Sequence, residues 1–430
     1  MPISRRHVLA GSLAAGFAGR AHAAVDRNIR AELSIQIYGA ERNMVLLRQA
    51  QDRLKQRLPN VTFRNSIEPP IQSWADYTSK IISQVTARRA YDVYHLAIEG
   101  LRSVATRDLF TPLDAYIAGD ADAAHHLADI APALRDALKY NGGQYMIPDQ
   151  WNNIVMYYNR AAFRDAGLEP PKPDWTWADF LAVCQRLTKR DANGNVTQWG
   201  YEVPTLHFAL TAWFLANDTL QLNPDWTESN LDDPKMRETL QFLRDLIHEH
   251  RVAPVPGSDA FRGGADQMFS TGRIAMVSRG HWPINVYAAN NFHDYDVQYM
   301  PRNRSSRSVF GVAGYGIAKD STNKDLAWEM IKELVSDQSM AEIAGAGVAI
   351  PARRSATMLP SFMAEPQNAG IFYASIDNAT AVPAPANFSQ MEDVVLRMYT
   401  QIMTNTASVD AASAAGHAEM RRAMANLRRR

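Results

Sequence analysis

The alternation of strand-like and helix-like segments near the N-terminus is the feature that most constrains this fold. Apolar residues at every second position of 33–37 predict a strand that ends at Gly39. Apolar residues at helical spacing over 44–58 predict a helix that stops at Pro59. A second strand at 61–64, a helix at 77–88 and a third strand at 91–97 complete a βαβαβ unit. Such a unit requires a parallel sheet, and the fold class is α/β.

The carboxyl ends of two of these strands carry acidic residues. Glu41 follows the first strand in Gly39-Ala40-Glu41, and Glu99 follows the third strand in Ala97-Ile98-Glu99. Ligands of open α/β sheets bind beyond the carboxyl ends of the strands, so both loops are expected to flank one cleft. The alternative, equally open at this point, is that each acid only stabilises the first turn of a helix.

Length and composition bound the remaining possibilities. A chain of 430 residues is long enough for two or three domains. Its 45 basic residues balance its 45 acidic residues, which argues against nucleic acid as a partner. A single cysteine, Cys184, excludes an intramolecular disulfide and a thiolate-rich metal cluster, and it is expected to pack as a small apolar side chain.

The first 23 residues have the pattern of an export signal. Arg5-Arg6 precedes a short apolar run from Ala10 to Ala18, and Ala21-His22-Ala23 has the form that a signal peptidase cleaves. This order is typical of a twin-arginine signal, and it predicts a periplasmic mature protein that begins near Ala24. The alternative is a disordered basic N-terminus. No later segment reaches about 18 uninterrupted apolar residues, so the mature chain is expected to be soluble.

Turn signals divide the middle of the chain. Asn141-Gly142 between two strand-like segments predicts a tight hairpin. The β-prone run over 151–159 is a candidate for a crossing between domains. Farther on, a helix is expected to start near Trp177, with Asp174 or Thr176 as its N-cap.

Motifs for metal binding or catalysis are weak. Asp191, Asn193, Asn195 and Glu202 match four positions of a calcium loop, but Val196 replaces the required glycine and a plain turn is favoured. Residues 125–126 and 248–250 contain paired histidines without the helical spacing of a zinc site, and they are expected on solvated faces. No nucleophile motif is present, and we expect no cofactor, no metal and no catalytic residue.

Six groups of segments in a fixed order resemble a known family, the extracellular solute-binding proteins of family 1, which are maltose-binding-protein-like sugar carriers of ABC importers. The resemblance covers nearly all of residues 30–355. The segments that carry it are 91–93 with 108–113, Gly143-Gln144-Tyr145-Met146-Ile147-Pro148 with Tyr158-Asn159-Arg160, Pro173-Asp174-Trp175-Thr176-Trp177, Gln198-Trp199-Gly200-Tyr201, residues 269–276, and Gly311-Val312-Ala313-Gly314-Tyr315-Gly316-Ile317.

The resemblance implies a periplasmic binding protein fold in which two lobes joined by a hinge enclose a ligand cleft. One lobe is expected to comprise residues 24–148 and 303–337, and the other residues 149–302 and 338–430. Ligand binding would draw the lobes together. The implied partners are a small carbohydrate and the membrane permease of an ABC importer, and the protein is expected to be a monomer without enzymatic activity.

The family's binding positions can be transferred to this chain one at a time. Glu99 matches an acceptor of sugar hydroxyls, Trp282 an aromatic that stacks on a sugar ring, and Gly314-Tyr315 a glycine-rich loop at the ligand. Aromatic planes grip the apolar faces of a pyranose, and polar side chains bind its hydroxyl edges. The alternative for each aromatic is a place in the core. The full set of expected ligand-binding residues is Glu41, Glu99, Asp149, Trp151, Asn152, Trp282, Gly314, Tyr315, Arg353 and Phe388.

The leading functional hypothesis is therefore a carbohydrate receptor. A second hypothesis keeps the fold and replaces the solute with a phosphorylated polyol or another anion, held by Arg353 and helix N-termini. A third, of another class, is a secreted carbohydrate-active enzyme that uses Glu41 and Glu99 as its two acids.

Overall fold

A seven-stranded sheet built from both halves of the chain organises one part of the protein. The computed structural model describes residues 25–69 and 73–427, so the expected export signal lies outside the described residues. β1 pairs in parallel with β2 and with β3, as the βαβαβ pattern predicts. The order is β13-β6-β12-β3-β1-β2, and β14 also pairs with β12. The strands are β1 (Ala31–Tyr38), β2 (Val61–Glu68), β3 (Val93–Ala97), β6 (Ile147–Asn153), β12 (Ser308–Ile317), β13 (Ile350–Pro351) and β14 (Ala379–Ala381).

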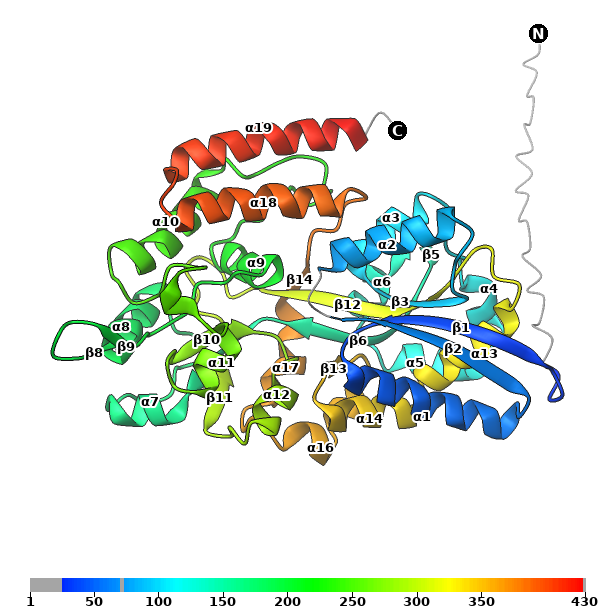
Figure 1. Cartoon of the computed structure of the whole chain (residues 1–430). Helices are drawn as coiled ribbons and strands as arrows, with labels where there is room; N and C mark the ends of the chain where they lie inside the picture. The colour runs from blue at the N-terminus through cyan, green and yellow to red at the C-terminus, as the bar shows by residue number, and fades with distance from the viewer. Residues whose placement is uncertain (1–24, 70–72, 428–430) are drawn as a thin grey trace, which may run out of the picture.

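Helices cover both faces of this sheet (Figure 1). The apolar stripe of α1 packs with Leu33, Ile35 and Ile37 of β1 in one core. Ion pairs at 2.8 Å, Arg57 to Glu333 and Arg53 to Glu342, join α1 to α13 and α14. The helices of this region are α1 (Glu41–Arg57), α2 (Trp74–Thr86), α3 (Ile98–Ala105), α4 (Asp114–Ala118), α5 (Ala121–Ala128), α6 (Pro132–Ala137), α13 (Lys324–Leu334) and α14 (Asp337–Ala346).

The hairpin predicted at Asn141-Gly142 is confirmed. β4 (Lys139–Tyr140) and β5 (Gly143–Gln144) pair as antiparallel strands around these two residues. Asn141 and Gly142 have φ values of 49° and 84°, the left-handed backbone that a two-residue hairpin turn requires. The hairpin places the chain at the start of β6.

The expected crossing between domains is also present. β6 of the large sheet ends at Asn153, and β7 (Val155–Asn159) begins one residue later as the central strand of a second sheet. Ile154, which joins them, is 1% exposed. The second sheet has the order β10-β7-β11, with β10 (Met276–Arg279) and β11 (Tyr295–Gln298) antiparallel to β7.

A second group of helices surrounds the three-stranded sheet. Thr176 caps α8 in a capping box with Asp179, which settles the N-cap between the two residues that the sequence offers. Cys184 of α8 is a free thiol and fully buried, as expected for a cysteine that packs as a small apolar side chain. The elements of this region are α7 (Arg160–Asp165), α8 (Trp177–Leu187), β8 (Lys189–Arg190), β9 (Val196–Gln198), α9 (His207–Ala216), α10 (Pro234–His248), the 3₁₀ turn η1 (Asp259–Phe261), α11 (Ala265–Ser270) and α12 (Ile284–Ala289).

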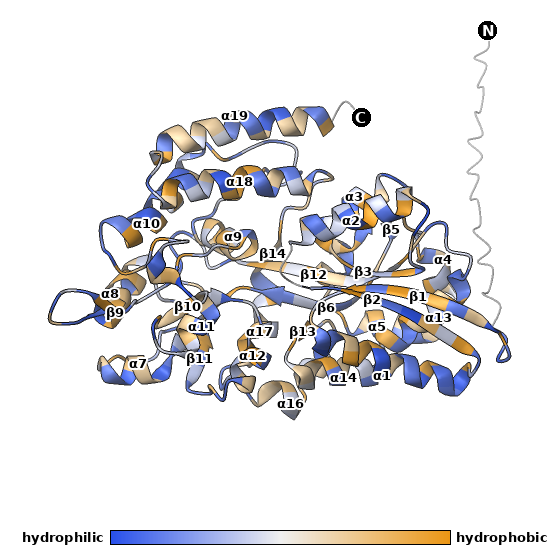
Figure 2. Ribbon diagram, in the orientation of Figure 1, coloured by the Kyte–Doolittle hydropathy of each residue, from blue (hydrophilic) through white to orange (hydrophobic). Residues whose placement is uncertain are grey.

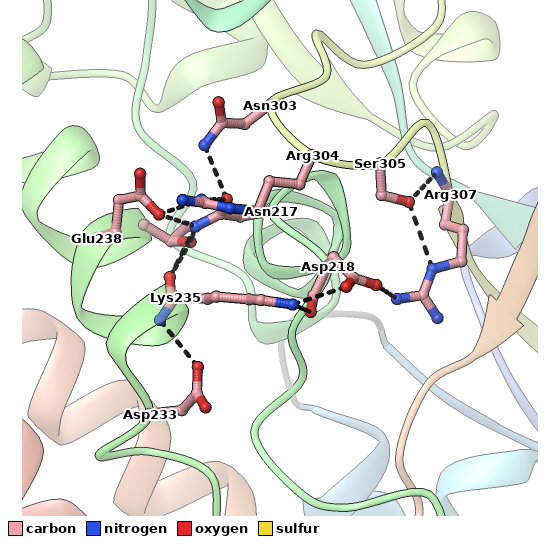
Figure 3. A network of polar contacts seen from close by, with 10 residues as sticks. Asn217, Asp218, Asp233, Lys235, Glu238, Asn303, Arg304, Ser305 and Arg307 are labelled. Carbon is pink, nitrogen blue, oxygen red and sulfur yellow. Dashed lines mark hydrogen bonds and ion pairs between the residues drawn. The ribbon is translucent and has the colours of Figure 1, made fainter.

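A polar network fixes the segment that returns from β11 to β12 (Figure 3). Asn303 donates to Asn217 Oδ1 at 2.8 Å, and Arg304 forms an ion pair with Glu238 of α10. Asp218 binds Arg307 of the same segment and, at 2.7 Å, Lys235 of α10. The second covalent connection between the sheets is therefore held against α9 and α10.

The C-terminal region lies along both groups of elements. In Figure 1, α18 and α19 form the upper edge of the molecule, and α18 packs on α9 and α10 and also on α2 and α3. Ser103 of α3 donates to the carbonyl of Ala386, just before α18, at 2.8 Å. The remaining elements are α15 (Arg354–Thr357), α16 (Pro360–Met363), α17 (Gly370–Ala374), the 3₁₀ turn η2 (Ser375–Asn378), α18 (Phe388–Met403) and α19 (Val409–Leu427).

Hydropathy follows this layered arrangement (Figure 2). Apolar residues colour most of β3 and β12, whereas β6 is largely hydrophilic, and the outer faces of α1 and α19 carry polar residues. Over residues 25–69 and 73–427, no helix combines the length and the apolar character that a bilayer crossing needs.

Candidate functional site

Side chains from both groups of elements meet where the two sheets join. Asn152 of β6 pairs with Gly311 of β12, and β12 also pairs with β3, after which Glu99 begins the first turn of α3. Phe208 comes from α9, and Trp282 lies between β10 and α12. We call Glu99, Asn152, Phe208, Trp282 and Gly311 the junction site.

Gly311 is the centre of close contacts in the junction site. A Cβ atom at Gly311 would lie 3.3 Å from the ring of Phe208 and 3.7 Å from Glu99 Oε1. The ring centroid of Phe208 lies 6.4 Å from that of Trp282, with the planes tilted by 46°. The missing side chain at Gly311 therefore leaves room between a carboxyl group and two half-buried aromatic rings.

A second glycine sets the position of Trp282. A Cβ atom at Gly280 would lie 2.1 Å from the indole of Trp282 and 2.9 Å from Asn152 Oδ1. Asn152 Oδ1 accepts the backbone N–H of His281 at 2.9 Å. Because a side chain at position 280 would overlap the indole, glycine allows Trp282 to approach the backbone closely beside Asn152.

Glu99 is the most unusual member of the site. Glu99 is 6% exposed, and its Oε2 atom has no hydrogen-bond partner among the described residues. Burial raises the pKa of the Glu99 carboxyl group from 4.5 to about 7. A hydrogen bond from the backbone N–H of Glu99 lowers this pKa, and the negative charge of Glu392 raises it further. A buried carboxyl oxygen without a hydrogen bond costs stability, which makes Glu99 a candidate for contact with a ligand.

Further aromatic and acidic groups adjoin Glu99. Tyr38 ends β1, and its ring centroid lies 4.2 Å from that of Trp74, the first residue of α2. Burial raises the pKa of Tyr38 to about 12, with further contributions from the charges of Glu99, Glu392 and Asp76. The carboxyl ends of β1 and β3 therefore do flank one region, as the sheet topology predicts.

Glu41 and Glu99 lie in opposite environments. The side chain of Glu41 is 72% exposed in the first turn of α1, and it forms an ion pair with Arg48 of the same helix at 3.4 Å. Glu41 therefore fits the alternative expectation, that of an acid which only stabilises the first turn of its helix. The described contacts do not join Glu41 to the junction site.

Asp149 and Tyr315 lie together on another part of the large sheet. Asp149 is 2% exposed, and its Oδ1 lies 3.0 Å from His95 Nε2. The ring centroid of Tyr315 lies 4.8 Å from that of His95. With Tyr38 they line a cavity of about 20 Å³, which has room for about one water molecule.

Gly314 lies within β12, so the expected glycine-rich loop is a strand instead. A Cβ atom at Gly314 would lie 2.4 Å from the carbonyl oxygen of Ile147, at an irregularity in the pairing of β12 with β6. Glycine at this position allows two neighbouring strands to approach closely. The run of glycines in β12 is a packing feature that the sequence alone does not separate from a ligand loop.

Trp151 and Phe388 are packed into the interior. Trp151 is 1% exposed and meets Tyr373 edge-on at 5.7 Å. Phe388 is 3% exposed at the start of α18, 5.7 Å from His207. Because side chains alternate along β6, Trp151 and its neighbour Asn152 point to opposite faces of the sheet.

Arg353 is held by acids of its own. It is 5% exposed, its Nε lies 3.1 Å from Asp129 Oδ2, and it also forms an ion pair with Asp337. His125 Nε2 lies 3.0 Å from its Nη2. The guanidinium group is therefore occupied by protein partners.

Residues 191–195 form the plain turn that the sequence analysis favours over a calcium loop. Asp191 Oδ1 accepts the N–H groups of Asn193 and Asn195 at 2.9 and 2.8 Å, which makes a local turn between β8 and β9. Glu202 is buried and forms an ion pair with Arg279 at 3.1 Å. Throughout the described ranges, no cluster of three or more His, Cys, Asp or Glu side chains is placed to hold a metal ion.

The expectation of solvated histidines is wrong for His126. This residue is 2% exposed, and its Nε2 lies 2.7 Å from the carbonyl oxygen of Pro148. Burial lowers the pKa of His126 to about 4. The ring packs beneath the start of β6 because its one strong hydrogen bond compensates for its burial.

The sequence analysis missed Phe208 of the junction site and three residues near Glu99, namely Tyr38, Trp74 and Glu392. Tyr38 immediately precedes Gly39 at the carboxyl end of a predicted strand, so the rule that selected Glu41 and Glu99 could have selected it. Glu392 belongs to a helix about 300 residues farther along the chain, and only the fold brings it to Glu99.

Comparison with known proteins places this geometry in a family. Residues 63–370 match the family of bacterial extracellular solute-binding proteins. The maltotriose-binding protein of Pyrococcus abyssi is 22% identical over 272 residues, which are 62% of this chain and 55% of that protein. The chain thus spans about half the length of that relative. The diacetylchitobiose-binding protein of Streptomyces coelicolor is 21% identical over 355 residues, with 80% of this chain and 79% of that protein covered.

Solved structures show the same fold. An ABC substrate-binding protein from Listeria monocytogenes in complex with cycloalternan has a TM-score of 0.83 and 22% identity, and the match covers 92% of this chain and 100% of that one. A maltose-bound protein of T. maritima has a TM-score of 0.77 and 17% identity, with 92% and 100% covered. The two groups of elements are therefore the two lobes of a periplasmic binding protein fold, as the sequence predicts.

Proposed function

The chain belongs to the family of bacterial extracellular solute-binding proteins, and we propose that it captures a carbohydrate at the junction site and delivers it to the membrane permease of an ABC importer. The observation that carries this proposal is the placement of Phe208 and Trp282, 6.4 Å apart, beside the unpaired carboxyl group of Glu99. Aromatic planes suit the apolar faces of a sugar ring, and carboxylate and amide groups suit its hydroxyl edges.

The contributions of the two lobes explain how binding is coupled to closure. Glu99 and Gly311 belong to the larger sheet and its helices, whereas Phe208 and Trp282 belong to the elements around the smaller sheet. A solute that contacts both sets favours the closed arrangement, because the full set of contacts exists only there. The crossings at Ile154 and at residues 302–307, together with the segments that follow β13 and β14, serve as the hinge.

The names of the relatives support a carbohydrate as the solute. The two curated relatives are described as binding maltotriose and diacetylchitobiose, and the two structures contain cycloalternan and maltose. The alternative of an anionic solute held by Arg353 has less support, because Asp129 and Asp337 already occupy that guanidinium group. These relatives are binding proteins, so we assign no catalytic step to Glu41 or Glu99.

The remaining features of the proposal extend the sequence-based expectations. Residues 24–148 and 303–337 form most of lobe one and residues 149–302 and 338–430 most of lobe two, but β6 as far as Asn153, α14 and β13 pack with the large sheet and are assigned to lobe one. The protein is exported by the twin-arginine signal, cleaved after Ala23, and acts in the periplasm as a monomer. Of the other expected ligand-binding residues, Asp149 and Tyr315 line the cavity of about 20 Å³ beside Tyr38, whereas Trp151, Gly314, Arg353 and Phe388 are packed into the interior.

Ligand-induced thermal stabilisation tests the proposal. The chain from Ala24 onward is melted with mono- and oligosaccharides, polyols, polyol phosphates and amino acids. A ligand at 100 times its Kd adds about 2.7 kcal/mol, which for about 400 residues raises Tm by about 3 °C. A carbohydrate hit is expected, and stabilisation only by phosphorylated compounds or amino acids would contradict the proposal.

Two substitutions then locate the site. Trp282→Ala and Phe208→Ala each remove a ring that can stack on a sugar, and each is expected to weaken the carbohydrate hit at least about tenfold in calorimetry. Trp199→Ala is the matched control, because Trp199 is a half-buried indole after β9, outside the junction site. Equal affinity in all three variants would remove the junction site from the proposal.

A further inference from the structure

A contact between an arginine and a tryptophan joins the two lobes outside the junction site. Arg102 belongs to α3, which packs on β3 and β12 of the large sheet. Trp226 belongs to the segment between α9 and α10 in the other lobe. Arg102 Cζ lies over the ring of Trp226, 4.4 Å from the ring centroid. The contact is therefore a cation–π pair formed between the lobes.

The indole is the group that compensates the charge of Arg102. Over residues 25–69 and 73–427, no carboxylate forms an ion pair with this arginine, and burial lowers the pKa of its guanidinium group. Both Arg102 and Trp226 are half-buried. A tryptophan ring is the aromatic face that attracts cations most strongly, and the attraction grows when the pair is partly removed from water. Separation of the lobes would leave this guanidinium group without the ring.

The turn that carries Trp226 holds it in a backbone conformation that bulky residues avoid. Trp226 has a φ of 58°, in the left-handed region. The carbonyl of Asn223 accepts the N–H of Trp226 at 2.9 Å. Asn223 Oδ1 accepts the N–H groups of Thr227 and Glu228 at 2.7 and 3.0 Å. An unfavourable conformation that its surroundings enforce is typical of residues with a function, and here the turn presents the indole to the other lobe.

The same arrangement of the lobes forms this contact and the junction site. Glu99 starts α3 and Arg102 follows three residues later, so both side chains lie on one side of the helix. At the junction site, a Cβ atom on Gly311 of one lobe would lie 3.3 Å from the ring of Phe208 of the other. The two halves of the junction site are thus together where Arg102 meets Trp226.

We propose that Arg102 and Trp226 form a clasp that favours the assembled arrangement of the lobes before any solute is bound. They are positioning residues, because they act through the relative placement of the lobes and need not touch the solute. The clasp sets the fraction of empty protein whose cleft is already closed when a solute arrives. This inference goes beyond the proposed function, since it depends on the two-lobe fold and not on the identity of the solute.

Hydrogen exchange of the solute-free chain from Ala24 onward tests the clasp. The backbone N–H of His281 donates to Asn152 Oδ1 of the other lobe at 2.9 Å, so separation of the lobes exposes it to exchange. A half-buried cation–π pair changes an equilibrium about fivefold. Arg102→Met and Trp226→Leu are therefore each expected to speed exchange of this N–H about fivefold, while exchange within β1 stays unchanged.

Two further variants separate the clasp from local packing. Arg64 Cζ lies over the ring of Tyr91, 4.5 Å from the centroid, and both residues belong to the larger lobe. Arg64→Met therefore removes a matched pair within one lobe, and exchange at His281 should not change. Arg102→Lys keeps a cation that can lie over the indole, so its exchange rate should fall between those of the natural chain and Arg102→Met.

A double variant and a measurement of shape complete the test. Because the two side chains form one contact, combining Arg102→Met with Trp226→Leu should speed exchange no more than either change alone. Small-angle X-ray scattering should give each clasp variant a larger radius of gyration than the natural chain. Thermal melting verifies that each variant is folded.

The outcomes distinguish the clasp from the proposed function. Exchange rates and radii equal to those of the natural chain would overturn the inference, and so would effects that multiply in the double variant. Carbohydrate binding at the junction site is measured separately by calorimetry. Failure of the clasp therefore leaves the receptor function standing, and failure of carbohydrate binding leaves the clasp standing.

Discussion

Replacing Glu99 with glutamine should make the ligand-free protein more stable, and the gain should depend on pH. Burial raises the pKa of this carboxyl group from 4.5 to about 7. The folded state therefore holds the proton more tightly than the unfolded chain does, and its stability falls as the pH rises from about 4.5 through about 7. Each pH unit in that interval is worth about 1.4 kcal/mol, so the ionised carboxylate costs about 3 kcal/mol.

Glutamine mimics the protonated acid and does not ionise. Below about pH 4.5 the variant and the natural protein should therefore be equally stable, and above about pH 8 the variant should be more stable by up to about 3 kcal/mol. An unfolding entropy of about 2.1 cal/mol/K for each of about 400 residues converts this to a rise in Tm of about 4 °C.

Calorimetric melting of both proteins at steps of pH gives the difference directly. Titrating groups that do not interact with Glu99 cancel in this difference, and Glu249→Gln provides a background for an exposed acid. A difference in Tm that does not vary between acid and alkaline pH would refute the reasoning, since it would mean that Glu99 has an ordinary pKa. A variant that is less stable at every pH would show that Glu99 forms a stabilising hydrogen bond or ion pair that the structure does not contain.

Two more predictions concern the second lobe. Arg279→Met removes the partner of Glu202 in an ion pair whose side chains are 6% and 1% exposed. In urea denaturation the variant should therefore lose about 3–5 kcal/mol of its free energy of unfolding. A loss below about 1 kcal/mol would mean that water reaches the pair. Calcium at millimolar concentration should leave Tm unchanged, because Asp191 accepts the N–H groups of its own turn and Glu202 pairs with Arg279. A rise in Tm with calcium that Asp191→Ala abolishes would show instead that the loop binds the ion.

Local patterns in the sequence predicted much of the larger lobe. The strand over Ala31–Tyr38 and its parallel partners follow from apolar periodicity, and the hairpin at Asn141-Gly142 follows from turn chemistry, because both depend on neighbours in the chain. The crossing at Ile154 was anticipated only as one β-prone run. Its division between two sheets leaves no local mark, since the residues on both sides are equally suited to strands.

The site was predicted less completely than the fold. Glu99 was identified because strand ends are recognisable in the sequence, and the structure does bury it beside aromatic rings. Phe208 was missed because α9 is apolar on all sides, so no face of the helix stands out as the one toward a ligand. Trp151 and Asn152 could not both face one cleft, because consecutive strand residues point to opposite faces.

The lone thiol of this chain has a practical consequence for observing lobe motion. Cys184 is fully buried in α8, and burial raises its pKa well above that of an ordinary thiol, so it does not react as a thiolate under native conditions. A cysteine introduced on the surface of each lobe would therefore accept a fluorescent dye without any need to remove the natural one. Energy transfer between two such dyes would show whether the two lobes open and close in single molecules of an otherwise unaltered protein.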